Sequence, residues 1–299
     1  PLAEVEAALA GVERVHLACV VSLPAAGFVA FDAKVGTAGA GTAAGAASDS
    51  RTIENDLLRI EVNGDGTLNV ADKRSGVVHR HVLEIEDVGD VGDEYNYSPP
   101  AEDRRITNRG VAGATVSRHS SGPLRSGLRI EGVLDLPKEA SSDRTRRTVE
   151  TAPLSYAFDV ELTQGSPVVS CRVSVTNRAE DHRLRILFPT GARAVSQSRA
   201  DSAFGVVSRS AQRFVPSTPM PEAPVNAAPL QSVDDAGDGL VGMSVLSEGL
   251  MEYEVMAADG DADVARIALT VLRSVGWLSR EDLATRKGNA GPSLPTPGA

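Results

Sequence analysis

Apolar and polar residues alternate along most of the chain, and the alternation is clearest after residue 51. Aliphatic side chains occupy every second position from Leu58 to Val62, with charged residues between them. Because successive side chains of a strand point to opposite faces of a sheet, this period predicts a strand with one buried face. Residues 63–66, Asn-Gly-Asp-Gly, tolerate a positive φ, and the alternation resumes at Leu68 and Val70. These residues are therefore predicted to form a β-hairpin.

The segment from Ser155 to Phe188 shows the same period in three runs separated by two turns. We expect three antiparallel strands, with Asp159 on the outer face where Arg172 could pair with it. The single apolar face of such a meander has to be covered by a second sheet. Cys171 falls in the apolar row and is predicted to be a small core residue.

Further strands are expected elsewhere, and no segment longer than about two turns shows the helical period of about 3.6. They cover residues 128–136, 239–246, 253–257 and 266–275. Spaced prolines between residues 216 and 229 predict a long exposed loop, because each proline removes a ladder donor. The predicted fold class is all-β, a large antiparallel β-sandwich.

The chain is predicted to consist of a short first part, a linker and one large domain. Residues 37–47 read TAGAGTAAGAA, which has no large side chain to bury and is typical of a flexible linker. Its glycines lack the spacing of a phosphate-binding loop. We place the linker at residues 37–50, after the end of a small β module at 1–36. Residues 51–299 are expected to be a large β domain that is truncated at its C-terminus.

Composition restricts the partners of the chain. Its 299 residues contain 30 Lys and Arg against 40 Asp and Glu, a formal net charge of -10. This charge disfavours binding to nucleic acid or to an anionic membrane. No run approaches the roughly 18 apolar residues of a membrane helix. Cys19 and Cys171 supply neither a disulfide framework nor a CxxC metal motif, so we expect a reducing, cytoplasmic location.

Few residues suggest chemistry. His79 and His81 share one face of a predicted strand and could hold a metal ion, but no third ligand is close in sequence, and solvated strand residues are the simpler interpretation. Five carboxylates lie between Glu86 and Glu94. Such a run is typical of a loop that is exposed, binds a cation or serves a ligand, although the calcium-loop spacing is not met. Residues 259–263 mimic the start of a calcium loop but indicate a hairpin turn.

Two of the four tyrosines, Tyr95 and Tyr97, follow the acidic run directly. A tyrosine ring offers a flat apolar face to a sugar and a hydroxyl to its oxygens. Packing of both rings on the edge of a sheet is an equally good interpretation. No GxSxG, P-loop or HExxH motif occurs, so we assign neither a catalytic residue nor a metal ligand to this chain.

Several segments, taken together, point to a known family. They are IENDLLRIEVNGDGTLNVADKRSG (53–76), EDVGDVGDEYNYSPP (86–100), HRLRILFPTG (182–191), GLMEYEV (249–255) and LRSVGWLSREDLATRKGNAGP (272–292). In this order they resemble the large C-terminal β domain of glycoside hydrolase family 38 α-mannosidases, and the resemblance spans roughly residues 53 to 299.

The resemblance implies a galactose-mutarotase-like supersandwich preceded by the end of a small β module. It also implies that a separate N-terminal α/β barrel carries the nucleophilic Asp and the zinc site, so that the partners are this catalytic domain and a mannose-containing glycan. In the family the C-terminal domain lends a loop to the rim of the substrate pocket, and GDEYNY matches that loop. Tyr95 is therefore the first choice for a substrate contact, with Asp93 and Tyr97 behind it.

The leading hypothesis is the non-catalytic part of a zinc-dependent retaining α-mannosidase, inactive alone, which supports the barrel and completes the sugar pocket. A carbohydrate-binding module without catalysis is the first alternative, and mannose binding abolished by Tyr95→Ala would favour it. A purely structural domain is the second. A stable homo-oligomer with no response to sugar would favour that one.

Overall fold

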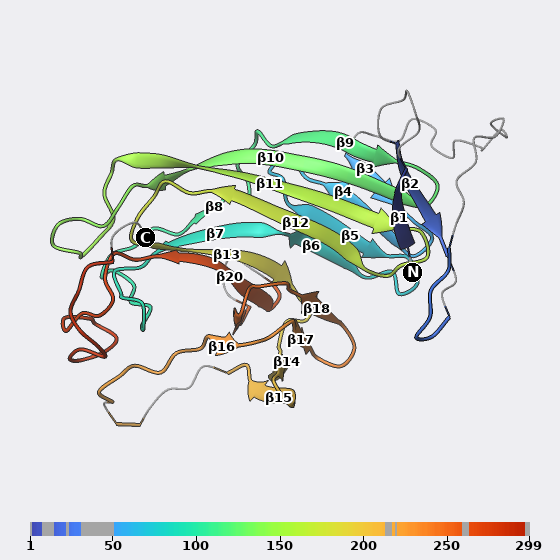
Figure 1. Ribbon diagram of the computed structural model, residues 1–299. Helices are drawn as coiled ribbons and strands as arrows, with labels where there is room; N and C mark the ends of the chain where they lie inside the picture. The colour runs from blue at the N-terminus through green and yellow to red at the C-terminus, as the bar shows by residue number, and fades with distance from the viewer. Residues whose placement is uncertain are drawn as a thin grey trace.

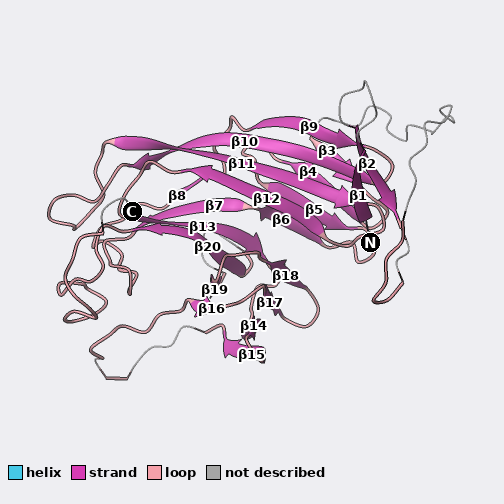
Figure 2. Ribbon diagram, viewed as in Figure 1, coloured by secondary structure: helices cyan, strands magenta, loops and turns pink. Residues whose placement is uncertain are grey.

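The described part of the chain consists of strands and loops (Figures 1 and 2). The computed structural model describes residues 2–7, 15–21, 24–30, 51–212, 217–218, 220–258 and 263–296. These ranges contain no helix with the length and apolar character needed to cross a membrane. The predicted all-β class with antiparallel sheets is confirmed. The predicted linker at residues 37–50 lies outside the described residues, as does most of the predicted turn at 259–263.

Twenty strands occur within these ranges. They are β1 (Leu2–Ala7), β2 (Val15–Val20), β3 (Thr52–Glu54), β4 (Leu58–Val62), β5 (Leu68–Asp72), β6 (Val78–Val82), β7 (Glu84–Gly89), β8 (Ile106–Thr107), β9 (Thr115–Ser121), β10 (Arg125–Pro137), β11 (Thr151–Thr163), β12 (Val169–Thr176), β13 (His182–Pro189), β14 (Gln197–Ser202), β15 (Gly205–Ser210), β16 (Ala228–Pro229), β17 (Val233–Gly237), β18 (Gly242–Leu246), β19 (Glu252–Met256) and β20 (Arg266–Ser274).

The strands are divided among five antiparallel sheets (Figure 1). Three of the sheets have four strands each, in the orders β3-β4-β5-β6, β12-β11-β10-β9 and β15-β14-β17-β18. The largest has six strands, in the order β16-β19-β20-β13-β7-β8, and β1 pairs with β2. The predicted hairpin is confirmed: β4 pairs with β5, and the Asn63 N–H donates to the Thr67 carbonyl at 2.8 Å.

The predicted three-strand meander is correct for two strands only. β11 pairs with β12, and Asp159 lies opposite Arg172, although the ion pair of Asp159 is with Arg129 on β10. β13 instead lies between β7 and β20. Both faces of β13 are buried, because its polar row meets charged partners from other strands instead of solvent. Cys171 is exposed, not in the core, since β12 is an edge strand of its sheet.

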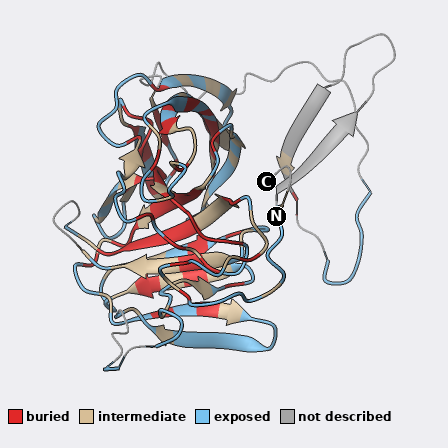
Figure 3. Cartoon of the chain, turned by 90° about the vertical axis from the view of Figure 1, so that its left-hand side faces the viewer, coloured by how far each residue is buried: buried red, intermediate tan, exposed pale blue. Residues whose placement is uncertain are grey.

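One hydrophobic core is shared by three sheets. It joins Ile60 on β4, Phe158 on β11 and Ile186 on β13, all at most 2 % exposed. Three sheets therefore enclose this core, where two were expected. A smaller core lies between β19–β20 and the sheet of β14, β15, β17 and β18, and includes Tyr253 and Ile267. Figure 3 colours the buried residues red, and they lie mainly along the strands.

Candidate functional site

The acidic run lies in β7 and in the loop of residues 90–100 that follows it, and most of it is buried. Glu86, Asp87, Asp90 and Asp93 are each at most 1 % exposed. A buried carboxylate needs a cation or several donors to remain ionised. The structure supplies arginines to all four, so the run is a set of buried ion pairs and not an exposed loop.

Glu86 lies between two arginines. Its Oε1 accepts from Nε of Arg105 at 2.6 Å, and its Oε2 accepts from Nε of Arg185 at 2.7 Å. Arg185 also donates to Glu254 at 2.6 Å. Burial by itself would raise the pKa of Glu86, but the charges of Arg185 and Arg105 outweigh it and hold the pKa below its ordinary value.

Asp87 joins a second buried group on the other face of β7. It pairs with Arg147 and accepts from Nδ1 of His182 at 2.6 Å. Nε2 of His182 lies 3.1 Å from Oδ1 of Asn177, which also accepts the Ala179 N–H. Both ring nitrogens of His182 therefore lie within hydrogen-bond distance of side-chain oxygens, and these contacts fix the orientation of the ring.

Asp90 shapes the first turn of the loop. One of its oxygens accepts the backbone N–H groups of Gly92 and Ser98, and the other accepts from Nε of Arg273 at 2.7 Å. The chain turns so tightly that a Cβ at position 92 would lie 2.0 Å from the Asn96 carbonyl oxygen. Only glycine fits there.

Asp93 attaches the loop to the segment of residues 275–296. Its Oδ2 accepts from Nη2 of Arg286 at 2.6 Å and from the Arg280 N–H at 2.8 Å. Its Oδ1 accepts the N–H groups of Tyr95 and Asn96. Burial opposes ionisation, but the hydrogen bonds and the charge of Arg286 prevail and lower the pKa of Asp93. Asp93 is fully buried with both oxygens engaged, so it holds the loop in shape.

The two tyrosines of the loop differ in environment. Tyr95 is 54 % exposed, and its hydroxyl lies beside Gly291, where a Cβ would be 2.9 Å away. Tyr97 is half-buried, and burial raises the pKa of its phenol. The Arg183 guanidinium stacks on the Tyr97 ring, 3.7 Å from its centroid. Of the three predicted contact residues, Tyr95 is the one that offers a substantial surface to a ligand.

The sequence identified the acids of this site but missed their arginine partners. Those partners lie on β13, β20 and three loop segments, up to 193 positions away along the chain. One local signal was present: Arg183 and Arg185 in HRLR at 182–185 are spaced to lie on one face of a strand, and Arg185 is the register partner of Glu86 on β7. Alternation of this kind does not show whether the charged row meets solvent or an oppositely charged row.

A metal site is not formed by the described residues. Among them, no three His, Cys, Asp or Glu side chains come together in a group that could hold a metal ion, so these residues do not fit a zinc centre. Nδ1 of His79 is 3.1 Å from the Pro189 carbonyl oxygen, and Nδ1 of His81 is 3.2 Å from Oγ1 of Thr67. Both histidines are thus hydrogen-bonded within the sheet region.

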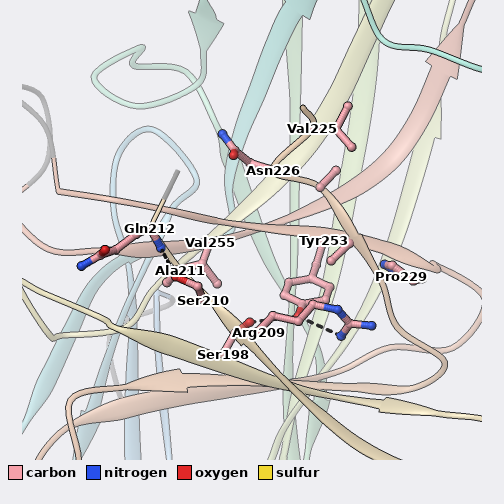
Figure 4. Close-up of a pocket in the computed structure, with 12 residues that line it drawn as sticks. Ser198, Arg209, Ser210, Ala211, Gln212, Val225, Asn226, Pro229, Tyr253 and Val255 are labelled. Atoms are coloured by element: carbon pink, nitrogen blue, oxygen red, sulfur yellow. Dashed lines mark hydrogen bonds between the residues drawn. The ribbon is translucent and has the colours of Figure 1, made fainter. Parts of the chain in front are cut away.

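A cavity that the sequence did not predict lies beside the smaller core (Figure 4). It has a volume of about 340 Å³. On one side Ser198 Oγ lies 2.9 Å from the Tyr253 hydroxyl, which also accepts from Arg209 at 3.4 Å. Asn226 also lines the cavity. Such donors and acceptors could bind a small polar ligand.

Several known proteins are similar to this chain over most of its length. No family model matches the chain. A protein of Halalkalibacterium halodurans named "Putative mannosylglycerate hydrolase" is 29% identical over 243 residues, which are 76% of this chain and 25% of that protein. The crystal structure of an α-mannosidase from Enterococcus faecalis V583 matches with a TM-score of 0.69 and 29% identity, over 80% of this chain and 28% of that chain.

A second Enterococcus faecalis structure, described as a protein in glycosyl hydrolase family 38, matches with a TM-score of 0.68 and 28% identity. It covers 80% of this chain and 29% of that one. The chain thus spans less than a third of the length of the relatives it matches. It is homologous to one portion of the α-mannosidases of glycoside hydrolase family 38.

Proposed function

We propose that this chain is the non-catalytic, all-β part of a longer α-mannosidase-type glycoside hydrolase, in which it supports the catalytic domain and completes the sugar pocket. The observation that carries the proposal is the similarity to family 38 proteins over only a part of their length. The zinc ion and the nucleophilic carboxylate of a retaining mechanism then belong to the remaining polypeptide.

Tyr95 is proposed as the sugar contact. Its ring is exposed, while the loop beneath it is held by the buried ion pairs of Asp90 and Asp93. A rigid loop with an exposed aromatic ring can stack on a sugar with little loss of conformational entropy. In this proposal Asp93 and Tyr97 position Tyr95 and do not themselves reach the sugar ring.

The substrate is proposed to be an α-mannoside. One relative is named as an α-mannosidase and another for the hydrolysis of mannosylglycerate, whose glycerate group carries a carboxylate. We include mannosides with an acidic aglycone in the proposed substrate class for that reason.

The finer architecture is also a proposal. We infer that residues 51–299 form one supersandwich domain, since three sheets share one continuous core. Residues 1–36 are proposed to end a separate small β module, to which the β1–β2 pair would belong.

The test compares the chain with the longer protein that contains it. We expect the chain alone to show no hydrolysis of an aryl α-mannoside, with or without zinc. In the longer protein, Tyr95→Phe and Tyr95→Ala should lower turnover, whereas Phe204→Ala, a control at the exposed turn between β14 and β15, should not. Zinc-dependent cleavage by the chain alone would overturn the proposal.

A sugar-binding module without catalysis is the second candidate, and the exposed ring of Tyr95 favours it. Titration calorimetry with mannose separates the two. Binding to the isolated chain that is lost in Tyr95→Ala, together with a longer protein that hydrolyses no mannoside, would establish the second function.

A further inference from the structure

Arg183 is a buried cation with no hydrogen-bond acceptor among the described residues. The residue is 6 % exposed, and its Nε is enclosed without a partner. Its close contact is the ring of Tyr97, at 3.7 Å. A guanidinium carries five N–H donors, and a ring face satisfies none of them with a directed acceptor.

The arginines next to Arg183, unlike Arg183 itself, each have a carboxylate partner. Arg273 lies directly opposite on β20, and Arg185 is two positions along β13, on the same face of the strand. Arg273 pairs with Asp90, and Arg185 pairs with Glu86 and Glu254. The carboxylates of this face are thus taken up by the arginines on either side.

The surroundings of Arg183 make its charge unfavourable. Burial and the repulsion of Arg185 lower its pKa, against the weaker attraction of Tyr97, Glu254 and Asp90. A buried charge without a hydrogen-bonded partner destabilises a fold. Natural proteins retain such a local defect chiefly at functional sites, where a ligand supplies the missing partner.

The geometry selects the class of ligand. The planar fork of a guanidinium matches a carboxylate with two parallel hydrogen bonds. Nε is enclosed and the residue keeps only a small exposed fraction, which favours a small carboxylate over a large polyanion as its partner. Tyr97, which covers the guanidinium, lies two residues from the proposed sugar contact, Tyr95.

We propose that Arg183, stacked on Tyr97, binds the carboxylate of an acid-bearing substrate and so selects mannosides with an acidic aglycone. That the carboxylate belongs to a mannoside is inferred from the proposed function. That Arg183 binds an anion is inferred from its guanidinium, which has no hydrogen-bond acceptor among the described residues.

The test uses D-glycerate as the probe and glycerol as its uncharged counterpart, with the full chain in calorimetry and thermal unfolding. Glycerate should bind and raise Tm, and glycerol should do neither. Arg183→Met should lose the glycerate response, and Arg183→Lys, which keeps the charge but not the fork, should weaken binding about tenfold. Arg129→Met, at an exposed ion pair on β10, should bind glycerate as the unchanged chain does.

Stability separates a binding role from a structural one. Without glycerate, Arg183→Met should have a Tm equal to or above that of the unchanged chain, because it removes an uncompensated buried charge. A Tm lowered as far as that of Arg185→Met would show a structural role and overturn the proposal. So would equal binding of glycerate and glycerol, or full glycerate binding by Arg183→Met. These measurements involve no hydrolysis. The anion site at Arg183 can therefore be refuted while the proposed mannosidase function stands, and the mannosidase function can be refuted while the anion site stands.

Discussion

Asp234 on β17 is predicted to make the stability of the chain depend on pH. Its side chain is fully buried, and neither carboxylate oxygen has a hydrogen-bond partner. It lies between Ala200 on β14 and Val245 on β18, which belong to the smaller core. Burial raises its pKa from 3.8 to about 7, since the pull of the Asp235 N–H and of Arg209 is too weak to offset desolvation.

The direction of the effect follows from proton binding in the two states. Below about pH 4 the carboxyl group is protonated in both the folded and the unfolded chain. Between about pH 4 and 7 the unfolded chain loses this proton while the folded chain keeps it, so the free energy of unfolding falls as the pH rises. At about 1.4 kcal/mol per pH unit, the total loss above pH 7 is about 4 kcal/mol.

The assay is urea unfolding of the chain and of Asp234→Asn from pH 5 to 8, followed by circular dichroism. The stability of Asp234→Asn relative to the unchanged chain should rise by about 1.4 kcal/mol per unit up to pH 7 and then level off. Asp235→Asn is the matched control, because Asp235 is half-buried and accepts from the Ser244 hydroxyl at 2.7 Å. A difference between Asp234→Asn and the unchanged chain that does not vary with pH would refute the reasoning.

Three further changes test the packing and the loop. Arg185→Met should lower the free energy of unfolding in urea by about 3–5 kcal/mol, because Glu86 stays buried with one cation fewer. Arg129→Met should lower it far less, because water screens the ion pair of Arg129 with Asp159. Phe158→Ala should cost about 3–5 kcal/mol and lower the midpoint of thermal unfolding, since the ring is fully buried in the larger core. Gly92→Ala should speed amide hydrogen exchange in the loop of residues 90–100, because the added methyl group has no space. Exchange rates equal to those of the unchanged chain would contradict this prediction.

The sequence predicted the strands better than it predicted their neighbours. Alternation located β4, β5, β10, β11, β19 and β20 within a few residues, since the period of two is a local property of an extended chain. It did not show that β13 leaves its predicted partner β12 for β7 and β20. That choice depends on contacts between segments about a hundred residues apart, such as Glu86 with Arg185.

The same limit explains the misread acidic run. Five carboxylates in nine residues indicate an exposed loop only if water solvates them. The arginines that neutralise the buried ones are distant in sequence, so the local pattern does not reveal them. Burial of Glu86 on β7 becomes possible once β13 places Arg185 opposite it in the register. The three candidate residues lie in one loop, but the burial of Asp93 and the exposure of Tyr95 could be learned only from the fold.

The position of Tyr95 depends on residues far along the chain. Gly92 allows the tight turn, Asp93 is held by Arg286, and the Tyr95 hydroxyl lies against Gly291. Two of these contacts come from the segment of residues 275–296, which follows the last strand of the six-stranded sheet. The segment of residues 275–296 and the loop of residues 90–100 hold each other in place, so both are needed to position the Tyr95 ring. A change at Arg286 should therefore act on Tyr95 as strongly as a change within the loop itself.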